Sequence, residues 1–350
     1  MTATGTRRKT KTPARRGKSK GASPKRAKST KSAGRSAGRD AETLAGGQRE
    51  ISVSEFFAKN RHLLGFDNPR KALLTTVKEA VDNALDACEE GGILPELFIG
   101  IEALSETRYV VTVRDNGPGI VRKQVENVFG KLLYGSKFHR LKMSRGQQGI
   151  GIAAAGMYGL MTTGKPMVIH TKPNRRKPSH RLTLAIDLKK NKADVSDEEE
   201  RHDFPTPTGT EVVIVLEGRF QRGRQSVDEY LQQTAIANPH ARIVYQPPDA
   251  GQQKEEDENG KMRIRRKPAS ELFDDLQHAL QLVTTASETT TTPGGIVVFP
   301  RTIEHLPEEP KEIKPHPRGV ELGMLLRMLK DTDHRQLGGF LQNEFCRVSL

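Results

Sequence analysis

The sequence predicts an α+β fold in which helices and strands are interleaved. Apolar residues recur at helical spacing in several long segments, and shorter segments between them alternate with a period of two. No second βαβ unit follows the glycine-rich loop near residue 149, which argues against a dinucleotide-binding fold. At 350 residues the chain is long enough to bury a sizeable core, in one large domain or two ordinary ones.

The N-terminal half is expected to begin with two helices. A short helix starts at Ser54 and ends near Gly65, and a long helix runs from Pro69 to about Glu90. Pro69 suits the first turn of a helix, because the N–H that it lacks would have no partner there. Strands are then expected at 97–104, 109–114, 168–171, 181–188 and 210–216, and further helices at 122–130, 149–161 and 227–238.

The C-terminal part is less regular. Within 247–292, residues 247–266 are polar and charged and residues 284–292 are Thr-rich, and both are expected to form surface insertions. A helix-like stretch at 271–283 lies between them. Residues 306–317 (LPEEPKEIKPHP) hold four prolines and predict a stiff linker, followed by helices at 319–330 and 334–345. The predicted organisation is a tail at 1–48, a main domain at 49–305, the linker at 306–317, and an incomplete helical domain at 318–350.

Most of the positive charge lies at the N-terminus. Residues 1–48 carry 14 Lys and Arg against 2 Asp and Glu, whereas the rest of the chain is nearly neutral. Such a segment buries too little apolar surface to order itself, so we expect a disordered basic tail. It suits a polyanion such as DNA, because each neutralised phosphate releases counterions. A solubilising extension and a transit peptide are the alternatives.

The chain has two cysteines, Cys88 and Cys346, and neither lies near a second cysteine or in a metal-ligand spacing. This favours a reducing compartment without structural zinc, and Cys88 is expected in the core because it lies on the apolar face of the long helix. Trp is absent, which disfavours a stacking platform for single-stranded nucleic acid. No apolar run is long enough for a signal peptide or a membrane span.

The long helix has a polar face opposite its apolar face. Glu79 and Asn83 lie one turn apart on the polar face, and Asp86 follows them. This face could simply be solvated. If another part of the chain covers it, Glu79 could polarise an attacking water, and the amide oxygen of Asn83 could bind Mg²⁺, which prefers oxygen ligands.

A second motif, Asp115-Asn116-Gly117-Pro118-Gly119, directly follows the strand at 109–114. Glycines there allow a tight reversal and a close approach of the backbone to a flat ligand. An aspartate at the strand end can accept a hydrogen bond from an exocyclic amine, which suits adenine. The alternative is an ordinary Asp-Asn-Gly turn.

A third motif, Gly146-Gln147-Gln148-Gly149-Ile150-Gly151, leads into a helix. Unpaired N–H groups at the start of that helix can bind an anion without any side chain. The spacing differs from the Rossmann pattern. Residues 159–166 nearly match a Walker A motif, but Pro166 stands where the Mg²⁺-binding hydroxyl is required, so we interpret Lys165 as an exposed turn residue.

The segment between the second and third motifs is cationic. It runs from Lys131 to Gln148 and contains Lys131, Lys137, His139, Arg140, Lys142 and Arg145. A mobile cationic loop between two phosphate-facing elements is a natural lid, and a plain surface loop is the alternative. His139 is expected to be a solvated lid residue rather than an acid or base.

Together these motifs resemble those of the GHKL ATPases, a superfamily that includes gyrase, MutL, the heat-shock chaperone and sensor histidine kinases. Gly209-Thr210, ahead of a strand, resembles the fourth and weaker motif. From about Ile51 onward the sequence is similar, more narrowly, to the B subunits of type IIB DNA topoisomerases, the DNA topoisomerase VI family. The segments that carry this similarity are SVSEFFAKNRHLLGFDNPRKALLTTVKEAVDNALDA, LLYGSKFH, SRGQQGIGIAAAGMYGLMTTGKP and EIKPHPRGVELGMLL.

The resemblance implies a two-layer α/β sandwich of the GHKL (Bergerat) type, with a mixed sheet covered by helices on one face and a partial helix–two-turns–helix domain after it. It implies ATP and Mg²⁺ as cofactors, with Glu79 as the general base and Asn83 as the Mg²⁺ ligand. Asp115 would bind adenine beside Gly117 and Gly119. The remaining nucleotide contacts would come from Ser136, Lys137, Gly146, Gln147, Gln148, Gly149, Ile150, Gly151, Ile152, Ala153 and Thr210.

The resemblance also implies a DNA strand-passage enzyme. ATP would dimerise two B subunits around double-stranded DNA, and a separate A subunit would make the double-strand break, in an A2B2 heterotetramer with no membrane partner. Its compartment would be the cytoplasm and nucleoid of a prokaryote or the nucleus of a eukaryote.

The family continues past residue 350 with a transducer domain that supplies a lysine to the γ-phosphate, so we expect the chain to be C-terminally incomplete. The alternative function is a nucleotide-gated DNA-binding module without efficient turnover. A sensor kinase would need a phospho-accepting histidine on an upstream helical hairpin, which the tail does not offer, and a chaperone or mismatch-repair relative would carry a different lid.

Overall fold

The computed structural model describes residues 53–131, 145, 149–187, 192–256, 262–266, 271, 274–279, 281, 287–308 and 314–349. The chain divides into two units, Met1–Glu50 and Ile51–Leu350, and every described residue belongs to the second. The predicted tail at 1–48 lies outside the described residues, as do the predicted site residues Ser136, Lys137, Gly146, Gln147 and Gln148. None of the described helices is long and apolar enough to cross a membrane.

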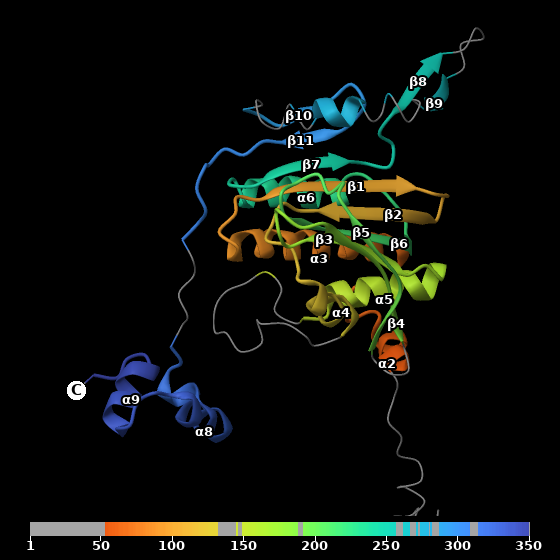
Figure 1. The fold of residues 1–350 in the computed structure, drawn as a ribbon. Coiled ribbons are helices and arrows are strands. Elements are labelled where there is room, and N and C mark those ends of the chain that lie inside the picture. Colours follow the sequence, from red (N-terminus) through yellow and green to blue (C-terminus); the bar gives the residue numbers. More distant parts are fainter. Residues whose placement is uncertain are drawn as a thin grey trace, which may run out of the picture. The chain divides into compact units, whose positions relative to one another are not determined.

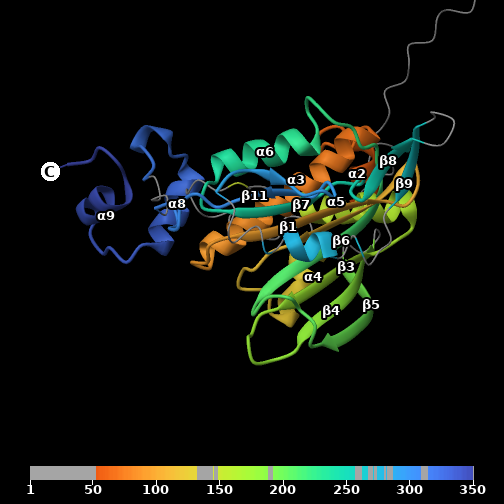
Figure 2. The same ribbon diagram turned by 90° about the horizontal axis from the view of Figure 1, so that it is seen from above.

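Among the described residues, nine strands form one mixed sheet in the order β10-β11-β7-β1-β2-β6-β3-β4-β5 (Figures 1 and 2). Neighbouring strands are antiparallel, except that β1 and β7 are parallel. This pairing confirms the α+β prediction. The bounds are β1 (Glu96–Ala103), β2 (Arg108–Arg114), β3 (Met167–Lys172), β4 (Ser179–Asp187), β5 (Lys192–Arg201), β6 (Gly209–Glu217), β7 (Arg242–Gln246), β10 (Thr290–Thr291) and β11 (Val297–Phe299).

Helices cover the sheet from β1 to β5, with α3, α4 and α5 packed on the strands and α6 packed beside α3. The long helix begins as predicted: Asn68 Oδ1 accepts a hydrogen bond from the Lys71 N–H at 2.9 Å, Pro69 occupies the first turn, and Gly91 caps the other end. The bounds are α2 (Val53–Asn60), α3 (Pro69–Glu90), α4 (Arg122–Gly130), α5 (Gly151–Thr163) and α6 (Val227–Ala237).

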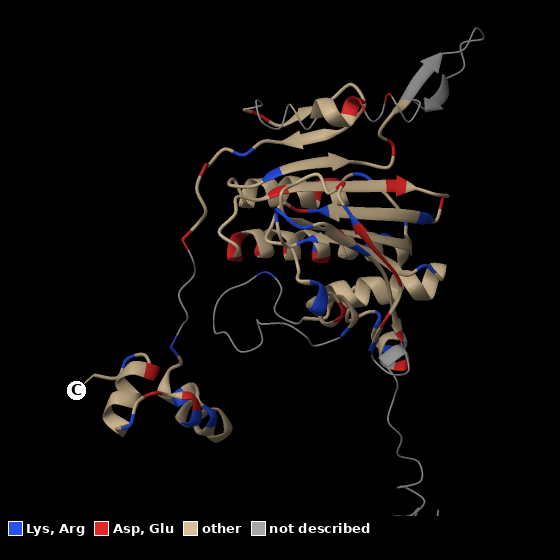
Figure 3. Cartoon of the chain, viewed as in Figure 1, with Lys and Arg blue, Asp and Glu red and all other residues tan. Residues whose placement is uncertain are grey.

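Several strands are absent from the sequence prediction, among them β5, β7 and β11. The sequence of β5 (KADVSDEEER) is rich in acidic residues (Figure 3), which conceals its extended conformation. The strand forms the edge of the sheet, and most of its side chains are exposed. Pairing with β4 and an ion pair between Arg122 Nε and Glu198 Oε1 at 2.5 Å hold it in place. A separate hairpin, β8 (Gln252–Glu256) and β9 (Met262–Arg266), lies within the predicted insertion at 247–266.

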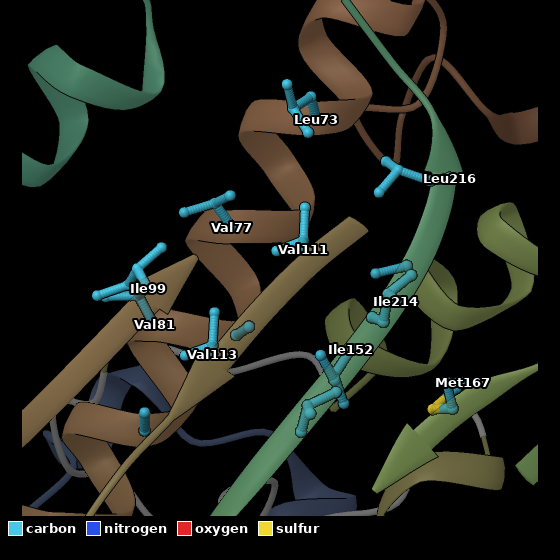
Figure 4. Packing of buried hydrophobic residues seen from close by; sticks show 14 of the residues in the cluster. Leu73, Val77, Val81, Ile99, Val111, Val113, Ile152, Met167, Ile214 and Leu216 are labelled. Carbon is cyan, nitrogen blue, oxygen red and sulfur yellow. The ribbon is translucent and has the colours of Figure 1, made fainter. Parts of the chain in front are cut away.

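The main core lies between the sheet and its helices (Figure 4). On β2, Tyr109, Val111 and Val113 are buried while the residues between them are half-buried, which is the alternation that the sequence predicts. Leu73, Val77 and Val81 of α3 pack against this face of the sheet. Cys88 is fully buried, so its predicted core position is confirmed.

A second, smaller cluster forms on the opposite face of the sheet. It contains Val244 and Val298, whose neighbours in β7 and β11 point into the main core, together with Ala279 and Ile296. Helical residues 274–279 therefore add a local layer over β7 and β11 to the two-layer arrangement.

The C-terminal residues form a short helical pair. A 3₁₀ turn (Pro317–Gly319) precedes α8 (Leu322–Asp331) and α9 (Leu337–Glu344). Thr332 Oγ1 donates a hydrogen bond to Glu344 Oε1 at 3.2 Å, and the rings of Phe340 and Phe345 meet edge to face at 5.5 Å. The sequence predicts helices at 319–330 and 334–345. Helix α9 lies inside its predicted range, and α8 ends one residue beyond its own.

Candidate functional site

The end of β2 and the start of β6 bring three predicted site residues together. Asp115 Oδ1 accepts hydrogen bonds from the backbone N–H groups of Gly117 at 2.8 Å and Thr210 at 3.1 Å. The Asp115 N–H donates to the Thr210 carbonyl at 2.9 Å. Burial raises the pKa of the Asp115 carboxyl to about 6, although its two backbone hydrogen bonds act in the opposite direction. The carboxylate is thus fixed in orientation, and both of these bonds use the same oxygen.

The two glycines after Asp115 are required by close packing. A Cβ on Gly117 would lie 2.9 Å from Asp115 Oδ1 and 3.3 Å from Cys88 Sγ. Gly119 has a φ of +71°, and a Cβ there would lie 2.5 Å from the Lys172 carbonyl oxygen. The turn is therefore tight and closely packed at the end of the strand, as the sequence predicts for these glycines.

Asn116 and Gly209 hold this turn from two sides. Asn116 Oδ1 accepts from the Glu96 N–H at 2.8 Å, and its amide donates to the Leu94 carbonyl at 3.1 Å. A Cβ on Gly209 would overlap the backbone carbonyl of Asp115. The Gly-Thr pair is thus explained locally: glycine permits the approach to Asp115, and the next N–H binds its carboxylate.

Sequence reasoning missed Thr171 on β3. It is fully buried, its Oγ1 accepts a hydrogen bond from the Ile120 N–H at 2.8 Å, and it lies 3.3 Å from Thr210 Oγ1. The available signal was a polar residue near the end of a strand that begins with three apolar residues. Thr171 links β3 and β6 to the backbone that follows Gly119, so it supports the same turn.

The start of α5 lies directly against α3. Gly151 is the first residue of α5, and a Cβ there would overlap the carboxylate of Glu79. Burial raises the pKa of Glu79, as does the negative charge of Asp82, and Lys78 opposes both. The half-buried carboxylate thus lies at the positive end of the α5 helix dipole, with no side chain from Gly151 between them.

The first N–H groups of α5 have no partner within the helix. Its first internal bond runs from the Ala154 N–H to the Ile150 carbonyl at 2.8 Å, and Ile150 provides no side-chain cap. Ile152 and Ala153 have buried apolar side chains, so only their backbone can meet a ligand. Gly149, with a φ of +58°, turns the chain into this helix. The arrangement suits an anion.

Asn83 lies one turn after Glu79 on α3, and its side chain is exposed. Its neighbour Asp82 is held by α6, because Tyr230 Oη donates a hydrogen bond to Asp82 Oδ1 at 2.9 Å. Burial raises the pKa of Asp82, whereas the bond from Tyr230 lowers it. An exposed amide oxygen beside two half-buried carboxylates fits Mg²⁺, which favours oxygen donors and retains several waters.

Helix α3 connects the two groups of residues. Glu79 contacts the start of α5, and Cys88, further along the same helix, contacts the turn at Gly117. At three glycine positions, 117, 119 and 151, a Cβ would collide with other protein atoms, so the absence of a side chain lets these segments pack closely around the two groups. The Walker-like match is not part of it: Gly164, with a φ of +71°, caps α5, and Lys165 is exposed in the following turn.

Arg145 lies within the predicted lid, where the sequence assigned it no separate role. In the structure it contacts Asp86 and Glu89 of α3 and Asn238 at the end of α6. Asp86, expected on a solvated or ligand-facing surface, is instead buried beneath this arginine.

The comparisons with known proteins match the part of the chain that holds these residues. Residues 68–217 match the family model of the histidine kinase-, DNA gyrase B- and HSP90-like ATPases. The chain is 43% identical over 306 residues to the B subunit of type 2 DNA topoisomerase 6 from Archaeoglobus fulgidus, an alignment that covers 87% of this chain and 43% of the relative. For the protein of the same name from Methanosarcina barkeri, the identity is 43% over 311 residues, with 89% and 43% covered.

The chain thus spans less than half the length of these curated relatives. The matched family model covers α3, the strand-end turn, α5 and β6, which hold every described site residue. The chain belongs to the histidine kinase-, DNA gyrase B- and HSP90-like ATPases and, within them, to the family of the B subunits of type 2 DNA topoisomerase 6.

Proposed function

We propose that the chain is the ATP-binding and ATP-hydrolysing part of the B subunit of a type IIB DNA topoisomerase. The observation that carries this proposal is the contact of Gly151 with Glu79, because it places a carboxylate against the uncapped start of a helix. The proposed base, Glu79 of α3, then lies next to the proposed anion site at the start of α5. The family membership supports the same function.

Adenine binding belongs to the strand end. Asp115 Oδ1 accepts its two backbone hydrogen bonds, so the second oxygen is the acceptor that we assign to the exocyclic amine. Gly117 and Gly119 would keep the turn tight beside the base, and Thr210 would orient the carboxylate through its N–H. An ionised aspartate accepts such a bond, whereas a protonated one accepts it less well.

The phosphates belong to the start of α5. The N–H groups of Gly151, Ile152 and Ala153 would donate to phosphate oxygens, assisted by the helix dipole. Asn83 would hold Mg²⁺ through its amide oxygen. When bound, the ion would neutralise phosphate charge in the transition state. Ser136, Lys137 and Gly146 through Gln148 complete the proposed contacts and lie outside the described residues.

Hydrolysis is assigned to Glu79. Its raised pKa makes it a better proton acceptor than an ordinary solvated carboxylate, and at neutral pH it can accept a proton from an attacking water. Asp82, held by Tyr230, contributes negative charge beside it and so favours that proton transfer.

The proposal extends to the assembled enzyme. ATP binding would dimerise two B subunits, gate the passage of one DNA duplex through a break made by the A subunit, and so relax or decatenate DNA in an A2B2 heterotetramer. The basic residues 1–48 would contact duplex DNA, and residues 318–350 would begin the helix–two-turns–helix domain. Removing 1–48 should weaken duplex binding and flatten its salt dependence, measured by fluorescence anisotropy over a salt series.

Nucleotide binding tests the core of the proposal. Isothermal titration of the 350-residue chain with a non-hydrolysable ATP analogue and Mg²⁺ should give saturable one-site binding that weakens when Mg²⁺ is removed. Absence of binding would refute the assignment of the site. Binding without ATP hydrolysis, in the presence of an A subunit and DNA, would instead favour a nucleotide-gated DNA-binding module.

A further inference from the structure

The C-terminal ends of α3 and α6 meet at a single arginine from another part of the chain. Arg145 Nη1 donates to Asp86 Oδ1 at 2.9 Å and to Glu89 Oε2 at 2.7 Å, and Nη2 donates to Glu89 Oε1 at 2.8 Å. Nη2 also donates to Oδ1 of Asn238, the C-cap of α6. The guanidinium thus forms a bidentate bond with Glu89 and bridges two helices.

A cation would stabilise this end of α3, and the last turn of the helix contains no basic residue. Its last turns carry Asp86, Glu89 and Glu90 without a basic residue, so acidic groups gather at the negative end of the helix dipole (Figure 3). The end of α6 also lacks a basic residue in its last turn. Arg145 is partly buried between them; burial lowers its pKa, but the bonds to Glu89 and Asp86 raise it by more, so it stays charged.

Further bonds fix the acceptor that Arg145 uses. His240 Nε2 lies 2.7 Å from Glu89 Oε1, and the carbonyl of His240 accepts a hydrogen bond from Arg301 Nε at 2.8 Å. Arg301 also donates to the Pro95 carbonyl at 3.1 Å, beside β1. Glu89 is therefore tied to the sheet, and a side chain bound to it has a fixed position.

Arg145 binds α3 close to the residues that we assign to the nucleotide site. Asp86, Asn83 and Glu79 share one face of α3, at helical spacing. Arg145 binds Asp86 at one end of this face, and Gly151 contacts Glu79 at the other, about 10 Å away along the helix axis for a seven-residue separation. Asn83 lies between these two contacts. Arg145 directly precedes the glycine motif in the sequence, and Gly151 follows it by six residues.

We propose that Arg145 is a positioning residue for the triphosphate: by binding Asp86, Glu89 and Asn238 it anchors the chain six residues before Gly151, whose N–H belongs to the proposed phosphate site at the start of α5. This inference rests on the proposed function. It adds a residue that should affect the binding of the phosphates and not that of adenine. Among the described residues, Arg145 has no contact with the Asp115 turn.

The test compares two ligands. Arg145→Ala should weaken the affinity for a non-hydrolysable ATP analogue with Mg²⁺ by about tenfold or more, as loss of a supporting charged bond does, and should leave adenosine affinity within about twofold. Arg145→Lys, which keeps the charge but not the bidentate geometry, should restore part of the loss. Arg222→Ala is the matched control, because Arg222 forms a bidentate pair with Asp249 (2.7 Å for both bonds), and its ion-pair partners among the described residues lie outside α3 and α5.

Each outcome separates the positioning role from a general one. If Arg145→Ala lowers the affinities for adenosine and for the ATP analogue by the same factor, the positioning role is refuted. It is also refuted if neither affinity changes. If wild-type protein binds adenosine but not the analogue, the proposed phosphate site itself fails. Should Arg145→Ala fail to fold, Glu89→Gln weakens the same bond more mildly. The ratio of the ATP-analogue affinity to the adenosine affinity, measured in Glu89→Gln and in Arg145→Lys, then tests the positioning role.

Discussion

The two halves of the site are stabilised in different ways. The strand-end turn, formed by Asp115, Gly117, Gly119, Thr171 and Thr210, is a closed set of hydrogen bonds within the protein. The helix face, formed by Glu79, Asn83 and Gly151, instead holds a half-buried carboxylate beside the charge of Asp82 and against an uncapped helix start. The strand end is therefore suited to recognition, and the helix face to chemistry that needs a proton acceptor.

This comparison predicts that the largest effect on rate comes from the helix face. Glu79→Gln should reduce ATP hydrolysis by a factor of about 10²–10⁴, because the amide cannot take a proton, while nucleotide affinity stays within about threefold. The hydrolysis rate is measured as phosphate release in the presence of the A subunit and DNA, and the nucleotide affinity is measured by calorimetry. Glu90→Gln, an exposed glutamate at the end of the same helix, is the control. An unaltered rate in Glu79→Gln would remove Glu79 as the base.

The strand end should respond in the opposite way. Asp115→Asn keeps an oxygen that can accept the bonds from Gly117 and Thr210, so the fold should persist. The second position then presents an amide donor to the adenine amine, and affinity should fall by about 10- to 100-fold. Calorimetry with the ATP analogue measures this loss, and circular dichroism checks the fold. Affinity equal to wild type would place adenine elsewhere.

The raised pKa of Asp115 adds a pH dependence to the same half. Its folded value of about 6 exceeds the ordinary 3.8, so between about pH 4 and 6 the folded protein holds a proton that the unfolded chain releases. The stability contributed by this group in nucleotide-free protein is present below about pH 4 and is lost as the pH rises through 6. Adenine affinity should rise over the same window, since binding needs the ionised form.

Melting temperatures and binding constants from about pH 4 to 7.5 check both slopes, with Asp115→Asn as the variant in which this contribution disappears. An identical pH profile in the variant and the wild type would assign the titration to another group.

The smallest expected effect concerns the support of the helix face. Tyr230→Phe removes the hydrogen bond to Asp82 and should cost about 1 to 2 kcal/mol of stability, as the loss of a bond to a charged group does. The hydrolysis rate should change by only a few-fold, because Glu79 stays in place. Thermal unfolding and phosphate release measure the two effects. A rate loss as large as that of Glu79→Gln would mean that Tyr230 acts in the chemistry itself.

Sequence patterns predicted the regular elements of the site well and its irregular ones poorly. The cap at Asn68, the proline at 69 and the apolar period of α3 depend on local interactions, and the structure has that helix at 69–90 as expected. By contrast, β5 is acidic and exposed, so its extended form depends on pairing with β4. The Thr171 contact likewise joins strands whose pairing no local pattern reveals.

The sequence by itself determined which residues are candidates for the chemistry, because helical period, glycine spacing and strand ends are set over a few neighbouring residues. It placed Glu79 and Asn83 on one helix face and Asp115 at the end of a strand. Only the tertiary structure decided that Gly151 lies against Glu79, that Thr210 binds Asp115, and that Arg145 joins two helix ends. These contacts link residues 59 to 95 positions apart, and they form only when the packed core brings the elements together.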